Sequence, residues 1–284
     1  MTPKLLTQFN YNRNKAILST PFAYEAFKSK MEKSIKDKEA GKKEDSLTGN
    51  TIVLTSDKPY SLVGDIAILS FSGFTVNDCS EMDEMFFGCI SLQGFCEDLE
   101  QAVEDDAVNS IVIDFDSGGG YTMYGDETAE LVKSLSALKP VYAYTSGLMC
   151  SLAYKIACNC SKLVASPTAL VGSIGVYCEY FDYTEAMKND GIKVTTFQAG
   201  SEKTIGSPFV PLTKEQSDAI QAEINNEWAS FKAIVTANRG NVNDSFMQGQ
   251  PFTGKEAMTL NTNLIDGNVN SLKQFVSLIS AANN

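Results

Sequence analysis

From about residue 51 onward, short apolar runs alternate with amphipathic helical segments, and this alternation constrains the fold more than any other feature. The run SIVIDF at 110–115 is typical of a buried strand, and helical patterns flank it at 92–105 and 125–138. Apolar runs separated by helices are the pattern of a parallel sheet that is covered on both faces. The sequence therefore predicts an α/β fold with a mostly parallel sheet.

The other predicted elements continue this alternation. Further strands are expected at 52–56, 64–73, 140–145, 162–166, 170–176 and 193–198. A helix should open near Ser151, after a strand that ends at Ser146–Gly147 and a short turn. The longest helical period runs from Leu212 to Gly240, and a final helix is predicted at 271–281. The apolar stripe of the long helix, expected to contact the core or an oligomer partner, is Ile220, Ile224, Trp228, Phe231 and Val235.

Residues 1–50 differ from the rest of the chain. The stretch Lys28–Lys43 is rich in lysine and glutamate, and the segment GKKEDSLTGN that ends near residue 50 has the composition of a solvated linker. We therefore predict a helical N-terminal arm with a charged linker over 1–50, followed by one domain over 51–284. A flexible arm and an arm that docks or is cleaved both fit this composition.

Net charge and cysteine usage exclude several classes of protein. The formal net charge of −12 argues against nucleic-acid binding, because phosphate recognition needs a basic face. The chain shows neither a signal peptide nor an apolar run long enough for a membrane anchor, so a cytoplasmic location is expected. Its 7 cysteines are irregularly spaced and often lie in apolar segments, which is typical of reduced thiols. No zinc spacing is present, and neither a metal nor a cofactor is predicted.

The chain contains no histidine, so a Ser-His-Asp triad and a Cys-His pair are impossible within it. Ser151 nevertheless stands where a nucleophile would, near the start of a helix whose dipole and Leu152 N–H stabilise negative charge. A neutral lysine is the best remaining base for a serine. The alternative is that Ser151 only caps the helix.

Two lysines are candidates for that base. Lys155 misses the SxxK spacing and is expected to point to solvent, whereas Lys203 lies in a loop rich in glycine and serine after a predicted strand. Cys150, beside Ser151, is interpreted as packing because nothing is present to activate it.

The turn DSGGG at 116–120 follows the buried strand directly. Successive glycines let a backbone bend sharply and bring its N–H groups close to a ligand, where they can hold an oxyanion. The spacing fits neither a dinucleotide fingerprint nor a P-loop. A plain tight turn remains an equal alternative.

Together these segments resemble the signal peptide peptidase A family of Ser-Lys serine peptidases, which includes phage prohead proteases. The likeness covers Gly64 to Val276. It rests on IDFDSGGG, on GLMCSLAYKIACNCSKLVASPTALVGSIGV, on FQAGSEKTIGSPFVPLTKEQ and on FTGKEAMTLNTNLIDG, which occur in the family's order.

The resemblance assigns roles to individual residues. It implies that Ser151 is the nucleophile, that Lys203 is the general base, and that Ser173 hydrogen-bonds and orients the lysine. Backbone N–H groups of Gly119 or Gly120 and of Leu152 would form the oxyanion hole. The implied fold is a crotonase- and Clp-protease-like spiral of ββα units, in which protomers form homo-oligomeric rings and a neighbour can supply the lysine.

Two departures from the family pattern concern specificity. Gly118 stands where the family turn usually has proline, and the bulky Leu152 replaces a small residue and is expected to narrow the substrate pocket. Because the chain lacks an anchor and carries an N-terminal extension, we favour a phage or prophage head-maturation protease. It would cleave scaffold, portal or capsid proteins in the bacterial cytoplasm or inside proheads.

Three alternatives remain beside this interpretation. The first is a soluble bacterial peptidase that degrades signal peptides or proteins. The second is a crotonase-fold acyl-thioester enzyme, which would use the same backbone hole without needing Ser151. The third is an inactive assembly scaffold, against which the intact Ser151, Lys203 and Ser173 argue.

Overall fold

The computed structural model describes residues 58–80, 83–84 and 87–283, so the predicted N-terminal arm and the strand at 52–56 lie outside the described residues. The chain divides into two compact units. Residues 176–230 form one, which we call the 176–230 unit. The described residues before 176 and after 230 form the other, which we call the sheet unit. No helix among the described residues is long and apolar enough to cross a membrane.

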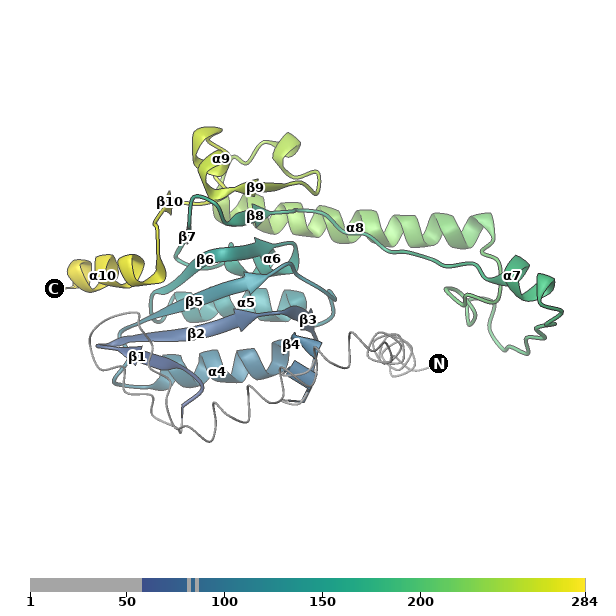
Figure 1. Ribbon diagram of the computed structural model, residues 1–284, viewed down its shortest axis with the longest axis horizontal. Coiled ribbons are helices and arrows are strands. Elements are labelled where there is room, and N and C mark those ends of the chain that lie inside the picture. The colour runs from purple at the N-terminus through teal and green to yellow at the C-terminus, as the bar shows by residue number, and fades with distance from the viewer. Residues whose placement is uncertain (1–57, 81–82, 85–86, 284) are drawn as a thin grey trace. The chain divides into compact units, whose positions relative to one another are not determined.

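A mostly parallel sheet is the centre of the sheet unit, as the sequence predicts (Figure 1). Its main strands follow the order β1-β2-β5-β6-β7-β10, and β8 pairs with both β6 and β9. Only β1 and β9 run antiparallel to their neighbours among the described strands. The bounds are β1 Ser61–Val63, β2 Ile66–Ser72, β5 Ser110–Ser117, β6 Val141–Cys150, β7 Lys162–Ala165, β8 Leu170–Gly172, β9 Pro251–Thr253 and β10 Gly267–Asn268. A separate parallel pair consists of β3 Phe74–Val76 and β4 Cys89–Ser91.

Helices cover both faces of the sheet. The larger apolar cluster joins one sheet face to α4 (Leu92–Glu104), α5 (Gly125–Ser136) and α6 (Leu152–Ala157). The smaller cluster joins the opposite face to α10 (Leu272–Asn283), through residues such as Phe275 and Ile279. Burial on both faces explains why the central strands read as continuous apolar runs.

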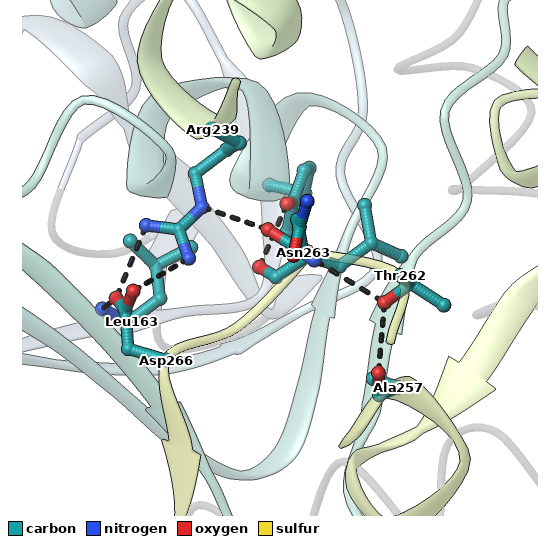
Figure 2. A network of polar contacts seen from close by, with 8 residues as sticks. Leu163, Arg239, Ala257, Thr262, Asn263 and Asp266 are labelled. Atoms are coloured by element: carbon teal, nitrogen blue, oxygen red, sulfur yellow. Dashed lines mark hydrogen bonds and ion pairs between the residues drawn. The ribbon is translucent and has the colours of Figure 1, made fainter. Parts of the chain in front are cut away.

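The end of α8 (Lys214–Arg239) is tied to the C-terminal segment, which also carries α9 (Gly254–Thr259) and the 3-10 turn Asp244–Phe246. Phe231 and Val235 of the predicted stripe are buried in the core. Figure 2 shows the Arg239 guanidinium donating to both carboxylate oxygens of Asp266, at 2.8 and 3.1 Å. The same carboxylate accepts from the Leu163 N–H at 2.7 Å, so one ion pair connects α8 to β7.

The 176–230 unit has little regular structure besides α7 (Thr184–Asn189) and the first part of α8. None of its side chains is buried. The Tyr180 hydroxyl donates to the carbonyls of Ser207 and Val210, which joins the two ends of its loop region. The predicted strand at 193–198 is wrong, because these residues have no strand partner and adopt no regular structure.

Asp114 is a partly buried carboxyl within the sheet. It lies in β5, two residues after Val112, and therefore on the face that α10 covers. Burial, together with the nearby Asp116 carboxylate, raises the pKa of Asp114 to about 6. A carboxyl group whose pKa is higher in the folded state than in the unfolded state destabilises the folded state once the group is ionised. The free energy of unfolding therefore falls as pH rises from about 4 to about 6.

We expect Asp114→Asn to stabilise the protein at pH 8 by up to about 3 kcal/mol, because the amide carries no charge to desolvate. The gain should be much smaller at pH 4, because the carboxyl is protonated in the folded state and only partly ionised in the unfolded state. Urea unfolding of wild type and variant at the two pH values measures the difference. An equal gain at both pH values would assign the effect to packing instead.

Candidate active site

The candidate residues gather where three parallel strands end. Ser117 of β5 pairs with Met149 of β6, and Cys150 of β6 pairs with Gly172 of β8. The glycine turn, Ser151 and Ser173 follow directly after these three strands. The carboxyl ends of parallel strands are the usual site of ligand binding in open α/β sheets. Register alone therefore brings three of the predicted site segments to one edge of the sheet.

Ser151 has a strained backbone. Its φ is +54° and its ψ is −127°, a conformation that side-chain-bearing residues rarely adopt, and its N–H donates to the Gly172 carbonyl at 2.8 Å. Ser151 occupies the N-cap position of α6, but its side chain makes no capping hydrogen bond, so the hydroxyl does not stabilise the helix end in that way. Such strain costs about 1–3 kcal/mol and concentrates at functional sites.

The strand before Ser151 is longer than predicted. It does not end at Ser146–Gly147, because β6 continues to Cys150 and its last residues pair with β8. Gly147 lies against the Asp116 carboxylate, where a Cβ would be 2.3 Å from Oδ1. The same Oδ1 accepts from the Leu148 N–H at 3.2 Å. Asp116 therefore holds the segment that leads to Ser151.

The glycine turn presses against Ser151. Gly119 has a φ of +91°, and a Cβ placed there would lie 2.7 Å from Ser151 Cβ and 2.9 Å from the Leu152 nitrogen. The Gly119 N–H donates to Ser117 Oγ at 3.1 Å, and Ser117 Oγ donates to the Gly73 carbonyl at 2.6 Å. This bond occupies the Gly119 N–H. Of the two glycines that the sequence left open, Gly120 is therefore the better candidate for an oxyanion donor, and its role stays a prediction.

Strand β3 fixes the same turn from its other side. The Thr75 N–H donates to the Gly119 carbonyl at 3.1 Å, and the Tyr121 N–H donates to the Thr75 carbonyl at 2.9 Å. A Cβ on Gly120 would lie only 2.4 Å from the Thr75 carbonyl oxygen. The turn is thus part of a ladder rather than a plain loop. Sequence reasoning missed the roles of Thr75 and Ser117.

Ser173 also has a positive φ, +50°. Its hydroxyl donates to the Gly249 carbonyl at 3.1 Å, and its N–H donates to the Gln250 carbonyl at 3.1 Å. With its proton committed to Gly249, the hydroxyl oxygen can still act as an acceptor. An acceptor is what a lysine amine needs for orientation. The predicted role of Ser173 stays a prediction that this geometry fits.

The predicted base, Lys203, belongs to the 176–230 unit, where it is exposed in a turn and its N–H donates to the Gly200 carbonyl at 3.2 Å. Lys155 was expected to point to solvent, and this was wrong: it is 2% exposed and forms an ion pair with Asp126.

Two further predictions concern the neighbours of Ser151. Cys150 is buried, and burial raises the pKa of its thiol to about 11, which fits a packing role. The side chain of Leu152 is buried, and its predicted effect on the substrate pocket stays a prediction. It is 2% exposed and packs against the start of α5, where a Cβ on Gly125 would lie 2.6 Å from Leu152 Cδ1.

The comparisons with known proteins agree with these features. The profile described as "Peptidase family S49" matches residues 133–282, more than half of the chain. A protein of Methanocaldococcus jannaschii is 35% identical over 162 residues, covering 56% of this chain and 52% of the relative. Capsid assembly protease C of Escherichia phage lambda is 28% identical over 207 residues, covering 69% and 47%. Head-tail preconnector protein GP5 of Enterobacteria phage P21 is 29% identical over 181 residues, covering 64% and 36%.

The chain spans about half the length of the curated relatives it matches, or less. Among solved structures, a membrane-bound stomatin-specific protease has a TM-score of 0.45 at 14% identity, covering 76% of this chain and 85% of that one. An enoyl-CoA hydratase/isomerase family member has a TM-score of 0.44 at 13% identity, covering 79% and 74%.

Proposed function

The chain belongs to peptidase family S49, and on that premise we propose that it is a serine endopeptidase with a Ser151-Lys203 dyad. The observation that carries the proposal is the strained Ser151, set between a glycine turn and the start of α6. A nucleophile held at a strained turn from strand to helix presents its oxygen away from the helix, as serine hydrolases on other α/β folds do.

The geometry supports acyl transfer through a covalent intermediate. Neutral Lys203 takes the proton of Ser151 as Oγ attacks the scissile carbonyl carbon, and the oxyanion is held by the Gly120 and Leu152 N–H groups. The lysine ammonium then protonates the leaving amine when the C–N bond breaks. A water molecule, deprotonated by the same lysine, attacks the acyl ester and releases Ser151 with its proton restored.

A second copy of the chain is proposed to complete the site. A lysine works as a base only when it is desolvated, and Lys203 is exposed. Exposed apolar side chains accompany it in the same unit and are typical of an unfilled interface. They are Tyr177, Phe181, Tyr183, Ile192, Val194, Phe197, Ile205 and Phe209. A homo-oligomeric ring would bury both the lysine and this apolar surface.

The substrates proposed for this peptidase are phage head proteins: scaffold, portal or capsid subunits. Support comes from the likeness to protease C of phage lambda and to GP5 of phage P21, both of which match more than 60% of this chain. The second candidate is a cellular peptidase. It is supported by the likeness to a protein of Methanocaldococcus jannaschii, which is a cellular organism and not a phage.

The test of the dyad compares Lys203→Met with Lys193→Met, an exposed lysine of the same unit. On an unfolded protein substrate, wild type and Lys193→Met should cleave faster as pH rises from about 6 to about 9, because only a neutral lysine accepts the serine proton. Lys203→Met should be about a hundredfold slower and lose this pH dependence. A wild-type rate that is flat over this range, with chemistry limiting, would remove Lys203 from the mechanism.

The same variants, co-expressed with the head proteins of the genome that encodes the chain, separate the two proposed substrate classes. Cleavage of a scaffold, portal or capsid subunit that depends on Lys203 supports head maturation. Cleavage of unfolded protein alone, with every head protein left intact, supports the cellular peptidase.

A further inference from the structure

The two proposed oxyanion donors reach the site on different segments. Gly120 belongs to the turn that leads into α5, and only four residues, 121–124, separate it from Gly125. The Leu152 N–H belongs to the first residue of α6. The distance between the two donors therefore depends on how the start of α5 is held against α6.

Two contacts hold the start of α5 against α6. Gly125 packs against the Leu152 side chain so closely that a Cβ would lie 2.6 Å from Cδ1. One turn further along α6, the Lys155 ammonium forms an ion pair with Asp126 Oδ1 in the first turn of α5. Gly125 and Asp126, the first two residues of α5, thus contact residues at the two ends of the first turn of α6. Gly125 contacts Leu152, and Asp126 contacts Lys155.

Helix α6 cannot hold this position by itself. It contains 6 residues, and a helix this short has little stability of its own, so its placement comes from tertiary contacts. Lys155 supplies such a contact from inside the protein, since it is 2% exposed while the side chain of Asp126 is 54% exposed. The same ammonium also makes a cation–π contact with Phe231, whose ring centroid lies 5.8 Å from Lys155 Nζ. The cation is therefore fixed rather than mobile.

We propose that Lys155 and Asp126 are positioning residues of the oxyanion hole. Their ion pair sets the separation between the Gly120 and Leu152 N–H groups. The inference rests on the proposed role of Ser151 as nucleophile. It assigns the buried lysine one turn after the serine to donor geometry, not to proton transfer.

The competing explanation is that the ion pair only stabilises the fold. Removing one partner of a buried pair is strongly destabilising, whereas replacing both with apolar residues is often neutral. The double variant Lys155→Met, Asp126→Leu therefore separates the two roles. It removes the ion pair and leaves no buried charge, so folding is retained even where Asp126→Asn alone, which leaves the buried Lys155 ammonium without this carboxylate, fails to fold.

The measurement is kcat and KM for peptide cleavage by wild type, the double variant and Asp126→Asn. One oxyanion donor is worth about 10²–10³ in turnover, so a displaced donor should lower kcat about ten- to a hundredfold with KM within about twofold. The matched control is Lys232→Met, which breaks the ion pair between Lys232 Nζ and Asp244 Oδ1 (2.9 Å) and should leave kcat unchanged. Wild-type kcat in the folded double variant would overturn the proposal.

Hydrogen exchange of the segment 148–157 gives a readout that does not depend on catalysis. The double variant and Asp126→Asn should exchange its amides faster than wild type, and Lys232→Met should not. Unchanged exchange in the double variant overturns the inference even if the wild type shows no cleavage. Absence of cleavage by wild type, with faster exchange in the variants, would instead count against the proposed peptidase function.

Discussion

Ser151→Ala should lower the rate of peptide cleavage at least about a thousandfold, since loss of a serine nucleophile leaves only the contribution of binding and the oxyanion hole. The residual contribution of the oxyanion hole and binding is itself about 10³–10⁴ over water in serine peptidases, so slow cleavage can persist. Detection of peptide products by mass spectrometry, with protein substrate in excess, measures the ratio.

Folding should be unaffected by this substitution. The Ser151 side chain makes no capping bond, and alanine meets the same backbone strain at a φ of +54° as serine does. Thermal unfolding of the variant should therefore match wild type. The control is Ser161→Ala, an exposed serine beyond α6, which should retain full activity.

The outcome for Ser151→Ala also decides among the classes of function. A variant that hydrolyses acyl thioesters as fast as wild type would favour a crotonase-type enzyme, because that chemistry needs the backbone hole and not the hydroxyl. Normal phage particles assembled with the variant, with no cleavage product missing, would favour a scaffold without peptidase activity.

Elements with long and regular periodicity could be predicted from the sequence. Four elements have an apolar pattern regular enough for their type to be assigned from the sequence. They are β5, α4, α5 and the 26-residue α8. The prediction of a strand at 193–198 failed because β-branched residues favour a strand only where a neighbouring strand is available to pair. Pairing is a property of the fold and leaves no trace in a short window of sequence.

The segments of the candidate site could be located from the sequence better than their geometry. Ser151 and the glycine turn stand out because strand-to-helix boundaries and successive glycines are visible in a sequence, and their catalytic roles stay predictions. Lys155 was misplaced because a lysine usually indicates a solvent-exposed position, and its partner Asp126 lies on another helix, α5, which the sequence does not place beside it. Its position within the apolar segment SLAYKIA was the one available clue to burial.

The end of β6 was misplaced for a related reason. Gly147 was interpreted as a turn residue, yet it lies within the strand because the Asp116 carboxylate occupies the space of a side chain, 2.3 Å from where its Cβ would be. A glycine that makes room for another residue is indistinguishable, in sequence, from a glycine that bends the chain.

Gly119→Ala should lower kcat at least about a thousandfold, which is more than the loss of one oxyanion donor alone. The added methyl would lie 2.7 Å from Ser151 Cβ and 3.0 Å from Ser151 Oγ, so the nucleophile and the turn cannot both keep their positions. Its φ of +91° adds strain of about 1–2 kcal/mol for any residue with a Cβ. Displacement of the adjoining Gly120 donor accounts for about 10²–10³ in turnover, and displacement of Ser151 Oγ adds to it.

Gly118→Ala is the matched control for this substitution within the same turn. A Cβ at position 118 would meet only Leu148 Cδ1, at 4.0 Å, which is an ordinary contact. The control should retain activity and gain about 0.4–1 kcal/mol of stability from the less flexible unfolded chain. Steady-state kinetics and urea unfolding of both variants measure the contrast.

Equal losses of kcat in the two variants would mean that flexibility of the whole turn matters rather than contact between Gly119 and Ser151. Full activity in Gly119→Ala would show that the productive conformation moves the turn away from the serine, and the oxyanion donor would then have to lie elsewhere.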